Sequence, residues 1–264
     1  MKHRHILLNM FIVMAPALTM ASQRTEELGT LYHTLDSLIE HQSEIIAQKK
    51  NRIQVIKDGM NNLMLTPEQQ FSLNNKLYDE YLAFNFDSAL CYIKKNVDVQ
   101  QSLDNPNLAA GSLIRMAHIL AVSGLFDKAD RMLDQIDISQ LSTECKVEYY
   151  NQRGELNLYR SEMAEYTPYF QEYTDSSQYY RQLILQIAPK DSYDYIFNQA
   201  TYISEKGDND GAIRMLEAYM RNLKQGERRY SIVTSTLAYF YSKKGESQLQ
   251  ERYFLLSAIS DMKG

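Results

Sequence analysis

Apolar residues recur at helical spacing along most of the chain, and short polar turns separate the apolar stretches. Near the start, spacings of three and four residues place two sets of side chains on helix faces. These positions are Leu28, Leu31, Leu35 and Leu38, followed by Ile53, Ile56, Met60 and Leu63. Gln42 and Lys49 interrupt the stripe between the two sets. We therefore expect a pair of helices packed on each other in residues 22–66, and a new helix from Pro67, with Thr66 as its cap.

One phrase recurs at the turns that follow. It occupies residues 124–129, 207–212 and 245–247, and a looser copy without glycine occupies residues 85–89. The separations are 83 and 38 residues between the glycines, and 40 residues from Phe86 to Phe126. A period near 40 indicates stacked helix pairs, because one such unit cannot bury its apolar face alone. The sequence predicts an all-α solenoid of antiparallel helix pairs, with about five pairs in residues 67–264.

Small residues mark where the helices of a pair approach closely. Ala117 and Ala129 permit that approach in the second pair, while Phe126 fills the space beside them. Asp127 has the right side chain to cap the following helix. In the fifth pair, Phe254 is expected on the packed face of the last helix.

The third pair departs from the pattern. Its helices are predicted over residues 143–159 and 176–187, with an unusually long connection, Met163 to Thr174, between them. Of the 20 tyrosines, 11 fall between residues 149 and 202. They serve either to fill the core or to form an aromatic surface for a ligand. The tyrosines of the connection are Tyr166, Tyr169 and Tyr173.

The first 21 residues have the pattern of a secretory signal peptide. A basic patch over residues 2–5 precedes an apolar run from Ile6 to Leu18, and residues 19–21 provide small side chains for cleavage before Ser22. The run is short for a membrane span. We expect an exported, periplasmic protein, with an uncleaved anchor as the alternative.

Charge and cysteine content exclude some classes of function. Removing residues 1–21 leaves 26 basic and 33 acidic side chains, with no basic cluster of the kind that binds nucleic acid. The two cysteines, Cys91 and Cys145, lie in different repeats. They are either free and buried or, in an oxidising compartment, joined as a disulfide.

The polar residues show no catalytic pattern. Histidines outside the leader are far apart, and no metal-binding His-x-x-x-His spacing occurs. Residues 208–211 resemble part of a calcium loop, but Lys206 stands at the first ligand position and Glu217 at the twelfth lies within a helix. We expect no catalytic, metal-binding or cofactor-binding residue, and therefore not an enzyme.

The Gly-x-aromatic-x-x-Ala turn resembles the tetratricopeptide repeat, although tryptophan is absent and the period is longer than usual. Four phrases together, at residues 35–39, 81–90, 123–129 and 256–263, resemble the N-terminal part of Bacteroidales membrane-anchored regulators. In that group, an exported tetratricopeptide-like region precedes a membrane helix and an uncharacterised cytoplasmic C-terminal domain. The resemblance implies a role in transcriptional or signalling control.

In a tetratricopeptide-like stack, the first helix of each pair lines a concave groove. The register places one polar-tipped side chain from four of the pairs at an equivalent inward position. These side chains are Tyr78, His118, Thr201 and Tyr239. They indicate a groove for a protein or peptide, with ordinary packing between repeats as the alternative.

These observations predict a non-catalytic, exported scaffold that forms the sensing or protein-interaction part of a membrane-linked regulator. Residues 253–256 are apolar, so the last repeat is expected to lack a polar cap, and the chain is expected to be a fragment whose membrane linkage lies beyond Gly264. A free-standing periplasmic binding protein for a glycan or small molecule is the alternative, which the tyrosines of residues 163–174 motivate.

Overall fold

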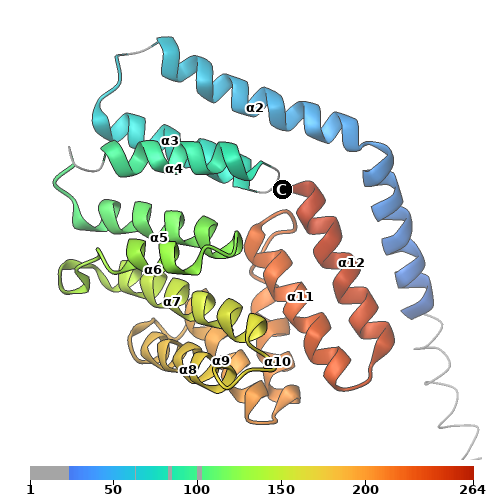
Figure 1. The fold of residues 1–264 in the computed structure, drawn as a ribbon. Coiled ribbons are helices and arrows are strands. Elements are labelled where there is room, and N and C mark those ends of the chain that lie inside the picture. The colour runs from blue at the N-terminus through green and yellow to red at the C-terminus, as the bar shows by residue number, and fades with distance from the viewer. Residues whose placement is uncertain (1–23, 63, 83–84, 100–102) are drawn as a thin grey trace, which may run out of the picture. The chain divides into compact units, whose positions relative to one another are not determined.

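The computed structural model describes residues 24–62, 64–82, 85–99 and 103–264, and these residues form helices and turns without any strand (Figure 1). The prediction of an all-α helical-repeat solenoid built from antiparallel helix pairs is confirmed. The predicted signal peptide at residues 1–21 lies outside the described residues.

From α3 onwards the helices follow one another as hairpins. The helices are residues 24–40, α2 (Gln42–Asn62), α3 (Pro67–Leu82), α4 (Phe86–Val99), α5 (Pro106–Val122), α6 (Phe126–Leu133), α7 (Thr143–Met163), α8 (Phe170–Ile187), α9 (Tyr193–Glu205), α10 (Asn209–Met220), α11 (Arg228–Lys243) and α12 (Ser247–Lys263). The hairpins whose two helices pack on each other within one unit are α3/α4, α5/α6, α7/α8 and α11/α12.

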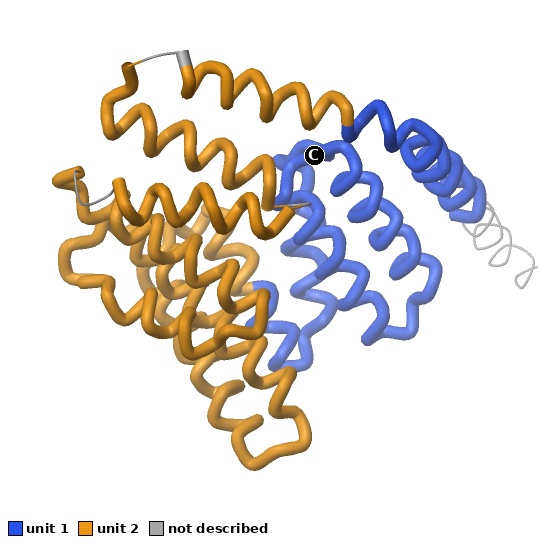
Figure 2. The backbone as a smooth tube through the Cα atoms, turned by 45° about the horizontal axis from the view of Figure 1, so that its top comes forward, with its two compact units in different colours: residues 1–46, 200–264 blue, residues 47–199 orange. Residues whose placement is uncertain are grey.

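The chain divides into two compact units, which Figure 2 distinguishes by colour. Residues 1–46 and 200–264 form unit 1, and residues 47–199 form unit 2. The division falls within α9, so unit 2 contains three complete hairpins and unit 1 contains α10 and the last hairpin.

In unit 2, small buried residues set the distance between helices. Ala117 of α5 and Ala129 of α6 are both 0% exposed, as predicted, and they share a core cluster with Leu133 and Leu156. Full burial of the leucine side chains is the main source of stability here, at about 1.5–3 kcal/mol each. A second cluster, around Leu77 and Ile93, joins α2, α3 and α4.

A charged network connects α6 to α7 in the same unit. The carboxylate of Asp130 accepts hydrogen bonds from Arg153, at 2.9 Å, and from Arg160. Arg153 also donates to Asp134 at 2.5 Å, and the Arg160 guanidinium lies 5.7 Å from the Tyr173 ring centre. Bidentate and shared arginine contacts of this kind give geometric specificity as well as energy, so they fix the register between these helices.

The predicted glycine turns share one backbone pattern. Gly124, Gly207 and Gly245 have φ values of 74°, 98° and 72°. At each, the glycine N–H donates to the carbonyl three residues earlier, and the next N–H donates to the carbonyl four residues before the glycine. This is the Schellman arrangement, which closes a helix and favours glycine because its middle residue is left-handed.

Of the two helix caps predicted from the sequence, Thr66 is confirmed and Asp127 is not. Thr66 and Gln69 form a reciprocal capping box at the start of α3, with N–O distances of 3.0 and 3.3 Å. Asp127 is not a cap, contrary to the prediction: Leu125 occupies that position, without a side-chain hydrogen bond. Asp127 lies in the first turn of α6, where its negative charge still suits the helix terminus.

The long connection predicted in the third hairpin is shorter in the structure. Met163 closes α7, and Phe170–Thr174 already belong to α8, so only residues 164–169 lie between the helices. The prediction was wrong because α7 extends beyond residue 159 and α8 begins before residue 176. Pro168 precedes α8, where a proline costs no intrahelical hydrogen bond. A long hairpin with a tight turn results.

Unit 1 contains two features that the sequence did not reveal. The helix of residues 24–40 contacts α12, where Glu27 accepts from Arg252 at 2.6 Å and Tyr32 donates to Glu251. On α12, Phe254 was predicted on the packed face, but it is 49% exposed. The neighbouring Tyr253, at 3% exposed, is the buried residue.

Residues 22–66 were predicted to contain two helices, and the described part of this region has helices at 24–40 and in α2. Only residue 41 separates them, and its N–H donates to the Ser37 carbonyl at 3.1 Å. The helix of residues 24–40 belongs to unit 1 and most of α2 belongs to unit 2. The packing of these two helices on each other stays a prediction.

Candidate functional site

One candidate site of unit 2 is a groove lined by the first helices of three consecutive hairpins. It has a volume of about 300 Å³, and we call it the α3/α5/α7 groove. Its lining residues are Phe71 and Asn75 of α3, Asn107, Leu108, Gly111 and Arg115 of α5, and Ser142, Glu144, Cys145 and Glu148 at the start of α7. The first helices are those that were expected to line a binding groove, although the lining residues differ from the predicted ones.

Helical spacing places the lining side chains together. Gly111 and Arg115 lie one turn apart on α5, and Phe71 and Asn75 have the same spacing on α3. Gly111 is buried, and a Cβ atom at its position would come no closer than 3.5 Å to another group, the Arg115 Nη1. Because this is an ordinary contact distance and the φ of Gly111 is not positive, an alanine would fit at this position, whereas a larger side chain would enter the groove.

Hydrogen bonds orient the two asparagines of the groove. Asn75 Oδ1 accepts from Asn96 Nδ2 at 2.8 Å, and Asn107 Oδ1 accepts from the Ser142 N–H at 2.9 Å. These bonds fix the orientation of both amides, since only the oxygen can accept. The two Nδ2 groups, together with the Arg115 guanidinium, leave hydrogen-bond donors for a ligand.

The rim of the groove is acidic, with exposed Glu144 and Glu148 at the start of α7. Between them lies Cys145, whose thiol is 3.7 Å from the Asn107 carbonyl oxygen. Burial raises the pKa of the Cys145 thiol to about 11, with a further increase from Glu148 and a decrease from Arg115. The thiol is therefore protonated at neutral pH and acts as a small apolar group, not as a nucleophile.

Of the four predicted groove residues, two belong to unit 2 and two to unit 1. Tyr78 is 3% exposed and belongs to the core of unit 2. His118 lies on the same α5 face as Arg115, one turn further on, where its Nδ1 is 3.4 Å from Glu155 Oε2. Thr201 and Tyr239 belong to unit 1, and the Tyr239 ring is 54% exposed with the Lys243 ammonium 4.5 Å from its centre. A single groove through all four stays a prediction.

The sequence analysis missed Asn75, Arg115 and Glu148. A signal was present, because each lies on a first helix, and Arg115 shares a face with His118. The sequence pattern selected His118, one turn after Arg115. Selecting Arg115 instead required knowing where the first helices leave space between them, which depends on packing between hairpins.

The tyrosines of the α7–α8 turn have two different roles. Tyr166 and Tyr169 are 94% and 60% exposed. Tyr173 is half-buried and stacks beside Arg160, so its ring supports the charged network between α6 and α7.

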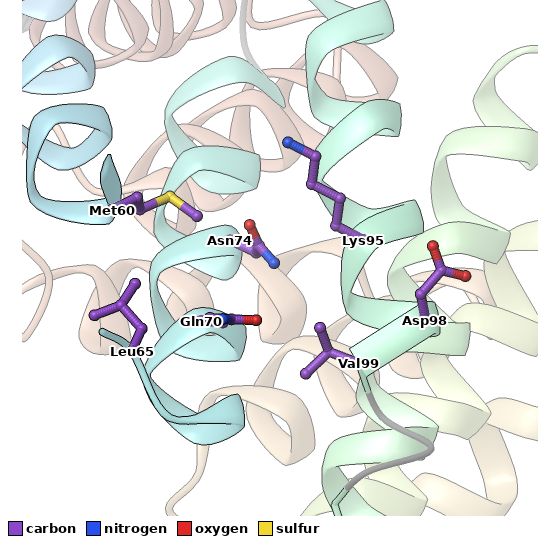
Figure 3. Close-up of a pocket in the computed structure, with 7 residues that line it drawn as sticks. All are labelled: Met60, Leu65, Gln70, Asn74, Lys95, Asp98 and Val99. Atoms are coloured by element: carbon purple, nitrogen blue, oxygen red, sulfur yellow. The ribbon is translucent and has the colours of Figure 1, made fainter. Parts of the chain in front are cut away.

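A second cavity in unit 2, also of about 300 Å³, lies between the end of α2, α3 and α4 (Figure 3). The amides of Gln70 and Asn74 and the Val99 side chain point into it, while the Asp98 carboxylate points away from α3. Asn74 is 2% exposed and its Oδ1 lacks a hydrogen-bond partner, but that oxygen is fully occluded. The lining charges do not converge, so this cavity offers a weaker site than the α3/α5/α7 groove.

Other chemistry of the described residues is limited. Within the part of the chain that the structure describes, no group of three or more His, Cys, Asp or Glu side chains is arranged to hold a metal ion. Cys91 is exposed and Cys145 is buried, and both are free thiols. Asp208, from the partial calcium motif, accepts a 2.7 Å hydrogen bond from the Gly211 N–H as the cap of α10. Among the described helices, none combines the length and hydrophobicity that a membrane span requires.

The stacked hairpins, the Schellman turns and a groove on the first helices define a tetratricopeptide-type helical-repeat protein, a class that generally mediates protein–protein interactions and is typically non-catalytic. Residues 39–264 match the family of SusR N-terminal TPR domains, and the chain belongs to this family. It is thus the helical scaffold of a regulator-associated family.

Other comparisons add little to this assignment. The crystal structure of BtubC (BKLC) from P. vanneervenii is similar, with 17% identity, a TM-score of 0.45 and coverage of 80% of this chain and 87% of that chain. No curated protein matches the chain significantly.

Proposed function

We propose that this chain is the exported, protein-sensing scaffold of a membrane-linked regulator, and that it binds a peptide segment of its partner in the α3/α5/α7 groove. The observation that carries the proposal is the set of fixed donors in that groove. Binding would alter how neighbouring hairpins pack and would pass that change along the array to the output region of the regulator.

The groove chemistry suits a peptide main chain. Asn75 Nδ2, Asn107 Nδ2 and the Arg115 guanidinium can donate to carbonyl oxygens, which an extended peptide presents at regular intervals. Glu144 and Glu148 on the rim favour a segment with basic side chains. Phe71 and Leu108 supply the apolar contact that peptide grooves also need.

The exported location and the membrane linkage rest on the leader and on the family. The leader pattern of residues 1–21 and the match to SusR-type regulators both support them. A fusion of residues 1–264 to alkaline phosphatase, which is active only after export, should give active enzyme, whereas deletion of residues 1–21 should abolish that activity. Equal activity without the leader would contradict the proposed location.

Substitution of Gly111 tests the groove. Gly111→Leu should fill the groove and weaken partner binding at least about tenfold, in line with loss of a central contact. Gly111→Ala is the matched control, because its Cβ fits at 3.5 Å from Arg115 and leaves the volume open. The measurement is co-purification of the partner with tagged full-length regulator, together with transcription of its target genes. If both variants behave like wild type, the groove is not the binding site.

A further inference from the structure

The turn between α7 and α8 presents an exposed apolar cluster at the end of the hairpin. We define this α7–α8 tip as Met163, Tyr166, Tyr169 and Phe170, with exposed fractions of 79%, 94%, 60% and 37%. Single exposed apolar residues are normal, but a contiguous group of large ones on a soluble protein marks an interaction site. Nothing in the α3/α5/α7 groove depends on this tip.

The backbone of the tip is ordered by its own hydrogen bonds. The Thr167 N–H donates to the Ala164 carbonyl at 2.8 Å, and the Thr167 hydroxyl donates to the same oxygen at 2.9 Å. The Tyr169 N–H donates to the Thr167 Oγ1 at 3.3 Å, and the ring of Pro168 restricts the backbone φ angle at that residue. The aromatic rings are therefore held on a rigid turn, and binding through them would cost little conformational entropy.

Two of the rings have no structural role within the described residues. Tyr166 and Tyr169 make no ring contact or side-chain hydrogen bond there, whereas Tyr173, a few residues on, supports Arg160. Tyrosine and methionine are enriched in protein interfaces, where their large side chains act as anchors.

The charged side chains that adjoin the tip in the chain have a single sign. Between Arg160 and Arg181 the chain has no Lys or Arg. The acidic side chains in this interval, all exposed, are Glu162, Glu165, Glu172 and Asp175. An anionic membrane surface or a nucleic acid would be repelled, and a second copy of this acidic chain would place like charges together. The complementary partner carries positive charge around an apolar anchor.

We propose that the α7–α8 tip is a docking surface for a basic amphipathic segment of a partner protein. The apolar side of that segment packs on Tyr166, Tyr169 and Met163, and its Lys or Arg side chains pair with the surrounding carboxylates. This is a second contact of the scaffold, on a different surface from the groove.

The probe for this proposal is a designed 18-residue amphipathic helical peptide with lysines on its polar face and leucines and one tryptophan on its apolar face. The protein contains no tryptophan, so peptide fluorescence reports binding without background. We expect binding to residues 22–264 that weakens as salt rises, because surface charges are screened. A peptide with glutamate in place of each lysine should not bind.

Variants locate the contact. Tyr166→Ser with Tyr169→Ser should weaken peptide binding at least about tenfold, as loss of interface anchors does, without changing the thermal unfolding midpoint. Tyr179→Ser is the matched control: this ring is 57% exposed on α8, about 14 Å beyond Phe170, and its loss should leave binding unchanged.

A second pair of variants tests the charges. Glu165→Gln with Glu172→Gln should weaken binding and reduce its dependence on salt, while Asp36→Asn with Glu40→Gln, on the helix of residues 24–40, should do neither. The proposal is overturned if the lysine peptide does not bind, if the tyrosine pair is dispensable, or if the tip instead binds phosphatidylglycerol vesicles or a linear glucan.

Discussion

A shared carboxylate in unit 1 gives a quantitative prediction about stability. Glu217 on α10 accepts hydrogen bonds from Tyr241 Oη on α11 at 2.8 Å and from Tyr253 Oη on α12 at 2.7 Å. The two phenol rings stack, with centres 5.4 Å apart and planes within 9°. Both tyrosines are almost fully buried, at 7% and 3% exposed. Three helices are thus connected through one acidic side chain.

The perturbation is the double substitution Tyr241→Phe with Tyr253→Phe. Phenylalanine keeps the ring stack and removes both hydrogen bonds to the carboxylate. A hydrogen bond to a charged group contributes about 1.5–3 kcal/mol, so the free energy of unfolding should fall by at least about 3 kcal/mol at pH 8.

The pH dependence distinguishes these hydrogen bonds from packing. Burial, and then the hydrogen bond to Glu217, raise the pKa of both Tyr241 and Tyr253 well above the usual tyrosine value. In the unfolded chain they lose their protons near pH 10, whereas the folded state keeps them. Their contribution is therefore complete below about pH 10 and is lost as the pH rises further. At pH 11, ionisation of each tyrosine in the unfolded chain lowers the free energy of unfolding by about 1.4 kcal/mol, or by about 2.8 kcal/mol for the two.

The assay is urea unfolding followed by circular dichroism at pH 8, 9.5 and 11, with hydrogen exchange of α10–α12 as a local measure. The difference in the free energy of unfolding between wild type and the double variant should decrease by about 2.8 kcal/mol from pH 8 to pH 11. Tyr239→Phe, which removes an exposed hydroxyl, is the control and should change nothing. A difference that stays constant over this pH range would refute the assigned role of the tyrosine protons.

Other predictions concern the glycines and the cysteines. Gly207→Ala should destabilise the protein by about 1 kcal/mol, because φ is 98° at this position. Gly29→Ala, in a helix with open space around the glycine, should stabilise the protein by about 0.5–1 kcal/mol. Thermal unfolding measures both effects, and equal effects would contradict the conformational argument. Cys91 should react with a thiol reagent at pH 8 in the native protein, and Cys145, with its pKa raised to about 11, only after unfolding. Two equally fast reactions would show that Cys145 is not protected.

Local features were accessible from the sequence because their causes are local. A glycine that follows a helical stretch takes the left-handed conformation that closes the helix, and this placed the turns at Gly124, Gly207 and Gly245 correctly. An alanine on an otherwise large apolar face marks close approach, which correctly selected Ala117 and Ala129. The helical-repeat architecture follows from the regular spacing of these two signals.

Boundaries and faces were less accessible where local signals compete. The connection predicted over residues 163–174 is shorter, because α7 and α8 both extend into it and Pro168, which precedes α8, costs that helix no hydrogen bond. Asp127 had the right chemistry for a cap, but Leu125 takes that position because the Schellman turn sets the helix start. In α12, Tyr253 and Phe254 are both large and aromatic, and the one that lies inside is the tyrosine, which donates a hydrogen bond to Glu217 of α10.

The sequence by itself therefore determined the class of fold, the turns and the small residues that space the helices, since these depend on interactions within a few residues. The tertiary structure alone decided which polar groups meet. Asn75, Arg115 and Glu148 come from three different hairpins, 33 to 40 residues apart, and share one groove only because the first helices pack side by side. Packing between hairpins sums many weak contacts over the whole unit, so no short pattern in the chain could specify it.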